Sequence, residues 1–223
     1  ASGFLADSAP LKTSAGFFVS YRDRSASDGI EYKGAFYNNN GNLLNTYDFD
    51  EGRTSPFPRA EPNATLLDNG NVAAVWYLGD SDGSFVQIFK PNGATVGGRI
   101  DVTNPNKSAL LSMTPAIATH PEGGFVVLDY QGTDALEMRI QRYSNSGDKK
   151  GKAITFDASV DGPFPFIGEP QIGFTKDGLM VVVNAACKDA DIAHLAAAMP
   201  TGIAVVPMPE RALLALQGPD AVA

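Results

Sequence analysis

A spacing of roughly 54 residues recurs along the chain and constrains the fold more than any other feature, because a fixed period of this size is typical of tandem structural units. Four glycines that each follow a short tetrad recur at this spacing: Gly41, Gly93, Gly147 and Gly202. Four upstream aspartates do the same: Asp28, Asp82, Asp134 and Asp189. So do three prolines: Pro62, Pro115 and Pro170. Three markers with one period predict four tandem units that stack on one another.

Each unit carries the signals of four short strands. A short strand follows the proline, and a glycine turn such as Asp68-Asn69-Gly70 or His120-Pro121-Glu122-Gly123 leads to the second. The second strand is the most apolar, as in Val72 to Trp76, which predicts burial on both faces. An alternating third strand such as Ser84 to Phe89 precedes the polar turn and the fourth strand.

The same strand signals recur in the other units. Second strands are predicted at 17–21, 125–128 and 179–183, a third strand at 137–143, and fourth strands at 99–102 and 153–156. The last unit departs most from the pattern, because its third strand is the Ala-rich His194 to Met199 and its fourth is Ile203 to Val206. Such drift is typical of a terminal unit that caps a stack or meets a partner.

Four antiparallel strands in about 54 residues match the size of a propeller blade. The sequence therefore predicts an all-β fold, a β-propeller of about four four-stranded blades. A β-sandwich or barrel is the alternative, but it does not explain a constant period. We expect one domain over residues 1–207, with units at about 1–56, 57–110, 111–166 and 167–207, and a C-terminal tail over 208–223.

The shared pattern is Gly-Phe-Val-Val-x-Asp/Trp, then Asp, then Gln-x-Tyr/Phe-x-x-x-Gly, and it is clearest in residues 72–102 and 124–156. It resembles the β-propeller repeats of secreted bacterial proteins. This resemblance implies an architecture and no particular activity, since propellers serve as lectins, hydrolases and scaffolds. Ser81-Asp82-Gly83 is only a fragment of the box found in sialidases.

One position at the end of the second strand is the leading ligand candidate. It holds Tyr21, Trp76 and Asp129, and Tyr130 follows Asp129. Aromatic side chains beside the loops of a propeller would stack on sugar rings. The alternative is that Tyr21 and Trp76 pack between units.

Clustered aspartates suggest a weak site for Ca²⁺, which takes six to eight oxygen ligands. The candidates are Asp80 and Asp82 in one segment and Asp48 and Asp50 in another. Neither segment completes a calcium-binding loop, and an Asp near a Gly also makes an Asx-turn to backbone amides. No other cofactor is predicted, because no Cys/His spacing supports a zinc site.

Composition excludes some partners. The formal net charge is −8, and no Lys/Arg stripe is present, so nucleic-acid binding is not expected. No apolar stretch is long enough for a transmembrane helix, so no membrane insertion is expected. The chain opens with Ala1-Ser2-Gly3 and no Met, as after cleavage of a signal peptide, which favours a secreted, periplasmic or cell-surface location.

These features favour a binding or assembly module whose blade loops meet a glycan or a protein. No catalytic residue is identified, and a Gly-x-Ser-x-Gly elbow is absent from the sequence. One alternative is a propeller hydrolase or lyase acting on carbohydrate. Another is a structural subunit that forms homo- or hetero-oligomers through exposed blade edges.

Overall fold

The computed structural model describes most of the chain in segments. These are residues 10–26, 29–51, 60–78, 83–102, 115–131, 137–157, 171–175 and 178–182, with 189, 192–193, 196–197 and 204–207. Apart from helical residues at 189, 192–193 and 196–197, every regular element in these segments is a β-strand, so the all-β prediction is confirmed. In the same segments no helix is long and apolar enough to cross a membrane.

The strands of the described segments form three four-stranded antiparallel sheets and one hairpin, each in chain order. The first sheet contains β1 (Leu11–Lys12), β2 (Gly16–Ala26), β3 (Gly29–Asn38) and β4 (Leu43–Asp48). The second contains β5 (Ala60–Leu66), β6 (Val72–Tyr77), β7 (Ser84–Phe89) and β8 (Thr95–Asp101). The third contains β9 (Ala116–Thr119), β10 (Phe125–Gln131), β11 (Glu137–Tyr143) and β12 (Lys149–Asp157). The hairpin pairs β13 (Gln171–Thr175) with β14 (Gly178–Val182).

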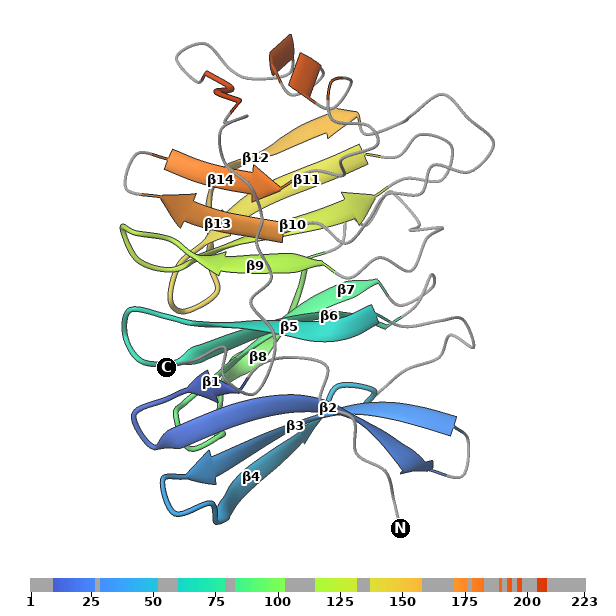
Figure 1. Ribbon diagram of the computed structural model, residues 1–223, viewed down its shortest axis with the longest axis vertical. Helices are drawn as coiled ribbons and strands as arrows, with labels where there is room; N and C mark the ends of the chain where they lie inside the picture. The colour runs from blue at the N-terminus through green and yellow to red at the C-terminus, as the bar shows by residue number, and fades with distance from the viewer. Residues whose placement is uncertain are drawn as a thin grey trace, which may run out of the picture.

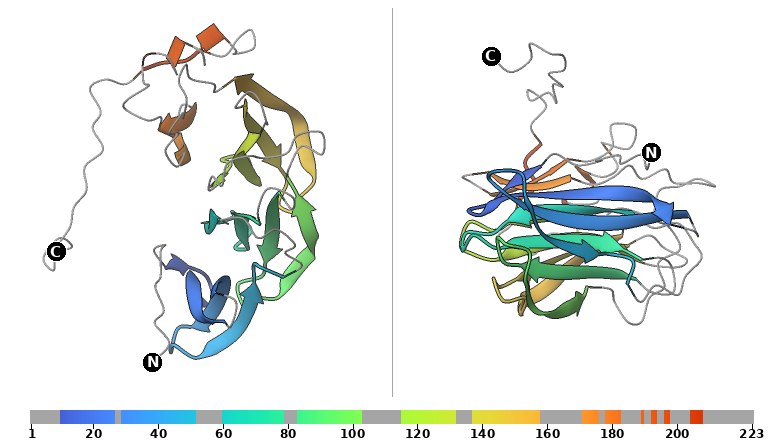
Figure 2. Two further views of the ribbon diagram at one scale, coloured as in Figure 1. Left: turned by 90° about the vertical axis from the view of Figure 1, so that its right-hand side faces the viewer. Right: turned by 90° about the horizontal axis from the view of Figure 1, so that it is seen from below.

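The three sheets are stacked face to face in series, not as two facing layers (Figure 1). Viewed from the side they fan out along an arc, with the first sheet at one end and the hairpin near the other (Figure 2). The first strand of each sheet lies on the concave side of this arc, where β5 neighbours β1 and β9, and β9 neighbours β13. The order of strands within a sheet therefore runs from the inside of the arc to the outside.

Aromatic side chains fill the space between the first two sheets. Phe18 and Phe36 of the first sheet meet Phe89 of the second, with ring centroids 6.5 and 5.3 Å from Phe89. Phe89 is fully buried. A second cluster joins the second and third sheets through buried aliphatic residues such as Ile88, which pack with Phe125. Because both faces of the second sheet are covered, every residue of β6 and β7 is buried, as the apolar run of β6 predicts.

Five hairpin turns share one backbone geometry at the same end of the sheets. In each, the first residue donates its N–H to the carbonyl of the residue four positions later. Its own carbonyl accepts the N–H of the residue three positions later. All five lie in turns that the sequence predicts. The residue three positions after the first is in every case a glycine with positive φ: Gly41, Gly70, Gly93, Gly123 and Gly147. Glycine is favoured there because L side chains clash in the left-handed region.

The glutamine of the repeated Gln-x-Tyr/Phe pattern has a structural role. The pairing of β7 with β8 shifts register between Val86 and Ile88, and Gln87 lies in that interruption. Its Nε2 donates to the carbonyls of Ile88, Val96 and Gly97 at 3.0, 3.4 and 3.5 Å. The side chain thus satisfies carbonyl groups where the strand ladder is interrupted by a bulge.

Gln141 does the same in the third sheet. It lies at the register shift between Ile140 and Arg142 and donates to the carbonyls of Arg142, Lys150 and Gly151 at 2.8, 3.3 and 3.5 Å. Both glutamines are buried, with 2% and 4% of their surface exposed.

Replacing Gln141 with alanine should lower the free energy of unfolding by about 1–3 kcal/mol, because it removes the side-chain donor to three backbone carbonyls. Gln141→Glu should cost at least as much, since an ionised carboxylate donates no hydrogen bond and is costly to bury. Urea unfolding followed by circular dichroism measures both changes. A loss below about 0.5 kcal/mol for both variants would show that the bulge does not need the amide.

The predicted strands of the first three units are confirmed, and β7 and β11 have the bounds that the sequence predicts. The last unit is different. The prediction of a third strand at His194 to Met199 is wrong for its described residues, since Ala196 and Ala197 are helical. The predicted fourth strand at Ile203 to Val206 is also wrong in its described part, because residues 204–206 belong to no strand. Alanine has the highest helix propensity, which the loose alternation of this segment does not overcome.

Candidate functional site

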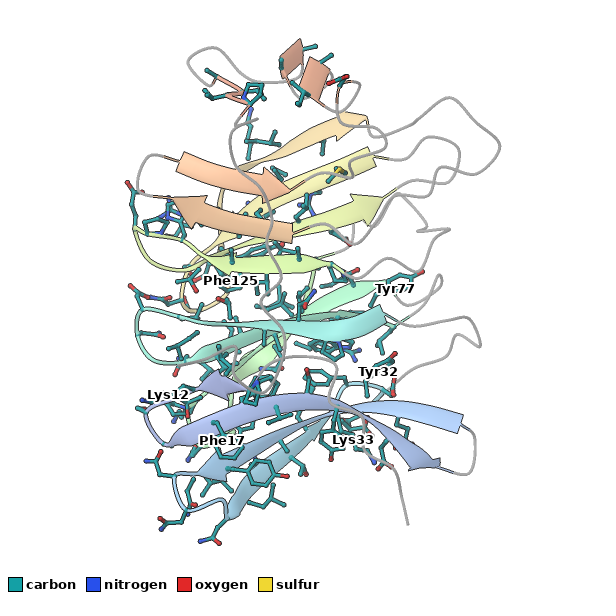
Figure 3. The ribbon with its side chains drawn as sticks, in the orientation of Figure 1. Lys12, Phe17, Tyr32, Lys33, Tyr77 and Phe125 are labelled. Carbon is teal, nitrogen blue, oxygen red and sulfur yellow. The ribbon has the colours of Figure 1, made fainter. Side chains whose placement is uncertain are left out.

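The two ends of the sheets differ in the connections that they carry. The turn end holds the five tight hairpins. At the opposite end, which we call the long-connection end, β4, β8 and β12 end and β5, β9 and β13 begin, so the chain passes there from one sheet to the next. In Figure 1 the tight hairpins lie on the left, and the strand ends at which the chain leaves or enters a sheet lie on the right. Tyr32, Lys33 and Tyr77 lie toward the long-connection end, and Lys12 lies at the turn end (Figure 3).

Carboxylates gather at the long-connection end. Seven acidic residues whose side chains are described lie on strand ends or turns there: Asp23, Glu31, Asp48, Asp50, Glu51, Asp101 and Asp129. Lys33 bridges two of them, with Nζ 3.2 Å from Asp23 and 2.8 Å from Glu31. The hydrogen bond to Glu31 is the main cause that raises the pKa of the Lys33 ammonium, and burial opposes it. Described acidic side chains thus outnumber basic ones at this end.

Two arginines fix the backbone where a connection leaves a sheet. Arg99 of the second sheet donates from Nη1 to the Glu51 carbonyl at 2.9 Å, and its guanidinium lies 4.2 Å from the centroid of the Phe85 ring. Arg139 of the third sheet donates from Nη1 to the Val102 carbonyl at 2.7 Å. Each arginine therefore ties the exit of the preceding sheet to the next one. No sequence signal indicates this role, since the two arginines stand at different positions in their units.

The predicted ligand residues occupy one register position in three sheets, and the structure does not bring them together. Tyr21 pairs with Lys33, Trp76 with Phe85, and Asp129 with Arg139. Trp76 faces the first sheet, and Asp129 accepts a hydrogen bond from the Ser84 hydroxyl of the second sheet at 3.1 Å. Tyr130 is in β10, but its side chain lies outside the described residues.

Trp76 packs between sheets, as the alternative to sugar stacking predicts. Only 2% of its surface is exposed, and the rings of Phe49 and Tyr47 lie 4.9 and 6.0 Å away. Its indole Nε1 is buried without a hydrogen-bond partner. No sugar ring has access to this indole in the structure, and ligand binding by the other candidates stays a prediction.

Tyr21 is half-buried on the outer face of the first sheet. Burial is the main cause that raises the pKa of its hydroxyl, and the nearby Lys33 charge opposes the shift. A phenol with a raised pKa stays neutral and keeps its O–H as a hydrogen-bond donor.

The two described calcium candidates are engaged in local backbone contacts. Asp48 accepts the N–H of Asp50 at 2.9 Å, and Asp50 accepts the N–H of Tyr32 at 2.7 Å. These are the contacts of an Asx-turn and a strand cap. Asp80 and Asp82 lie outside the described residues. In the described part of the chain no three His, Cys, Asp or Glu side chains group as metal ligands, and Ca²⁺ binding stays a prediction.

His120 belongs to the turn between β9 and β10. Its Nδ1 accepts the N–H of Glu122 at 3.1 Å, and its ring lies 4.8 Å from the Phe174 ring of β13. Burial is the main cause that lowers the pKa of this imidazole, helped by the charge of Arg142. The residue thus shapes a turn and joins the third sheet to the hairpin.

The sequence matches no protein-family model and no curated protein. The candidate site is therefore defined by the chain's own geometry. It lies at the long-connection end of the sheets, where the described carboxylates and the roots of the inter-sheet links come together.

Proposed function

We propose that this protein is a secreted or surface-associated binding module with a β-propeller fold, and that its long-connection end contacts a protein or glycan partner. The observation that carries the proposal is the asymmetry between the two ends of the sheets. Tight hairpins close one end, while at the other end the chain leaves one sheet for the next and the described carboxylates outnumber the described basic side chains. Binding residues are concentrated on loops that a rigid scaffold positions.

The propeller assignment is supported by three features. Each sheet has four antiparallel strands in chain order. The sheets stack in series along an arc, with their first strands on the concave side (Figure 2). Equivalent positions in neighbouring sheets also have the same role, as Gln87 and Gln141 do at their bulges. A sandwich would instead place two sheets face to face.

The chemistry of the long-connection end favours a partner that carries basic groups. Carboxylates outnumber Lys and Arg among the described side chains there, and like charges repel an acidic partner. Arg99 and Arg139 hold the roots of two connections. This reduces the ordering cost that binding would otherwise impose on the connections.

Binding should be tested with a glycan array and a panel of Lys/Arg-rich peptides. We expect an interaction that weakens with salt and that falls at least about tenfold in affinity in the double variant Glu51→Gln/Asp101→Asn, which removes two charges at the long-connection end. The matched control is Glu122→Gln/Asp148→Asn, which removes two charges at the turn end and should bind normally. Equal losses in the two variants, or no binding to any probe, would contradict the proposal.

A further inference from the structure

Each sheet has a leading face, which we define as the face directed toward the preceding sheet. In the second sheet this face carries the paired residues Val72 and Phe89, and in the third it carries Phe125 and Tyr143. All four side chains have 0% exposure, because the preceding sheet covers them. A leading face in this protein is therefore built to be covered.

The first sheet has the same apolar pair on its leading face, but no described sheet covers it. Phe17 and Tyr37 pair across β2 and β3, and their rings stack at 5.1 Å and 17°. The stack matches that of Phe125 and Tyr143, at 5.2 Å and 13°. Phe17 and Tyr37 are nevertheless only half-buried, and Phe17 lies on the side of the sheet away from the second sheet (Figure 3).

The space around the turn glycines also indicates that no described sheet covers the leading face of the first sheet. A Cβ on Gly93 would meet Asn45 and Phe36 of the first sheet at 2.6 and 2.7 Å, and a Cβ on Gly147 would meet Ile100 of the second sheet. A Cβ on Gly41, which has the same turn in the first sheet, meets nothing within 4 Å. The space that a preceding sheet fills in two cases is thus open in the third.

The outer strand makes this face more apolar than its counterparts. Leu43 pairs with Tyr37, so its side chain is on the same face, and it is 55% exposed. The position equivalent to Leu43 holds Thr95, opposite Phe89, in the second sheet and Lys149, opposite Tyr143, in the third sheet. The next residue, Leu44, is also 42% exposed. The first sheet therefore exposes a leucine, Leu43, where the covered sheets have polar residues.

The other end of the arc also exposes an apolar side chain. The segment 204–207, drawn in red, lies beyond the third sheet, at the far end of the arc from the first sheet (Figure 1). Val206 in this segment is 72% exposed. Among the described residues only four large hydrophobic side chains are exposed, and three of them, Leu43, Leu44 and Val206, lie at the two ends of the arc. Such patches mark interaction sites in soluble proteins.

We infer that the leading face of the first sheet docks onto the far end of the arc of a second copy of this chain. The contact repeats between copies the packing that already joins one sheet to the next within a copy. A contact between two different surfaces closes into a ring when the rotation allows it. Two arcs of four units would make a ring at the upper end of the usual range of about four to eight blades. The expected species is a closed head-to-tail dimer.

The test is the mass of the full chain by sedimentation and light scattering over a concentration series. We expect twice the monomer mass of 23.5 kDa. Leu43→Asp should raise the dissociation constant at least about tenfold, because it places a charge in an apolar contact. Leu43 is mostly exposed, so the variant should keep the wild-type circular dichroism spectrum and unfolding midpoint measured at dilution.

Thr95→Asp is the matched control, since Thr95 occupies the equivalent pair in the second sheet and is exposed. It should leave the dimer intact. Val206→Asp, at the other end of the arc, should weaken the dimer as Leu43→Asp does. A monomer at all concentrations would overturn the inference. So would a dimer that Leu43→Asp and Val206→Asp leave unchanged.

Discussion

Trp76→Ala should lower the free energy of unfolding by about 3–5 kcal/mol, the usual cost of truncating a large buried aromatic side chain. The indole is 2% exposed and is packed among Phe49, Tyr47 and Phe85, with ring centroids 4.9, 6.0 and 6.1 Å away. Alanine would leave a cavity between the first and second sheets that these rigid rings cannot fill. Urea unfolding followed by far-ultraviolet circular dichroism measures the loss.

Trp76→Phe is the matched variant. It keeps an aromatic ring in the interface and removes the buried Nε1–H that has no partner, so part of the lost packing is offset by about 1–3 kcal/mol of relieved desolvation. We expect it to lose less than half of what Trp76→Ala loses. If Trp76→Ala unfolded within about 1 kcal/mol of the wild type, the side chain would not lie between sheets.

This result also determines how binding experiments are interpreted. Loss of saccharide binding on Trp76→Ala would be the signature of a stacking residue in an exposed loop. In this fold the same substitution weakens the joint between two sheets, so lost binding would follow from lost structure. Variants of Glu51 and Asp101 distinguish lost binding from lost structure, because these two residues of the long-connection end are exposed.

The strands were predictable because their signals are local. Val72 to Trp76 is a continuous apolar run between two turns, and the structure extends it by one residue to Tyr77. Turn glycines such as Gly93 and Gly147 were predictable for the same reason, since positive φ is a requirement of the residue itself. A constant period then indicates that similar sheets follow one another.

The site was not predictable to the same degree, because the period fixes a register position but not what that position faces. Tyr21, Trp76 and Asp129 are equivalent in register, yet one faces outward and two face neighbouring sheets. The tie from Arg139 to Val102 joins residues 37 apart and depends on how two sheets pack. Such contacts are set by tertiary structure, which a local pattern does not encode.

Gly93→Ala should destabilise the protein more than Gly41→Ala, although the two glycines have the same turn. Both substitutions place an L side chain at positive φ, 87° and 79°, which costs about 1–2 kcal/mol. Only Gly93 is also pressed against another sheet, where a Cβ would lie 2.6 Å from Asn45 Cβ and 2.7 Å from the Phe36 ring. Overpacking of this kind adds about 1–3 kcal/mol.

The loss of unfolding free energy on Gly147→Ala should lie between the losses on Gly41→Ala and Gly93→Ala. Its Cβ would clash with Cδ1 of Ile100, but that atom is the end of a flexible side chain and can move aside. Asn45 Cβ is fixed to the backbone and cannot. The predicted order of loss is therefore Gly93, Gly147, Gly41, measured as urea midpoints at low protein concentration with unchanged slopes. Equal losses at Gly41 and Gly93 would mean that the first two sheets do not pack as described.

The stability loss caused by Gly41→Ala should depend on the protein concentration. If a second copy covers the leading face of the first sheet, the space around Gly41 is filled in the dimer as it is around Gly93 within one copy. The loss on Gly41→Ala should then grow as the protein concentration rises, because dimerisation stabilises the wild type more than the variant. The loss on Gly93→Ala involves contacts within one chain, so it should be the same at all concentrations.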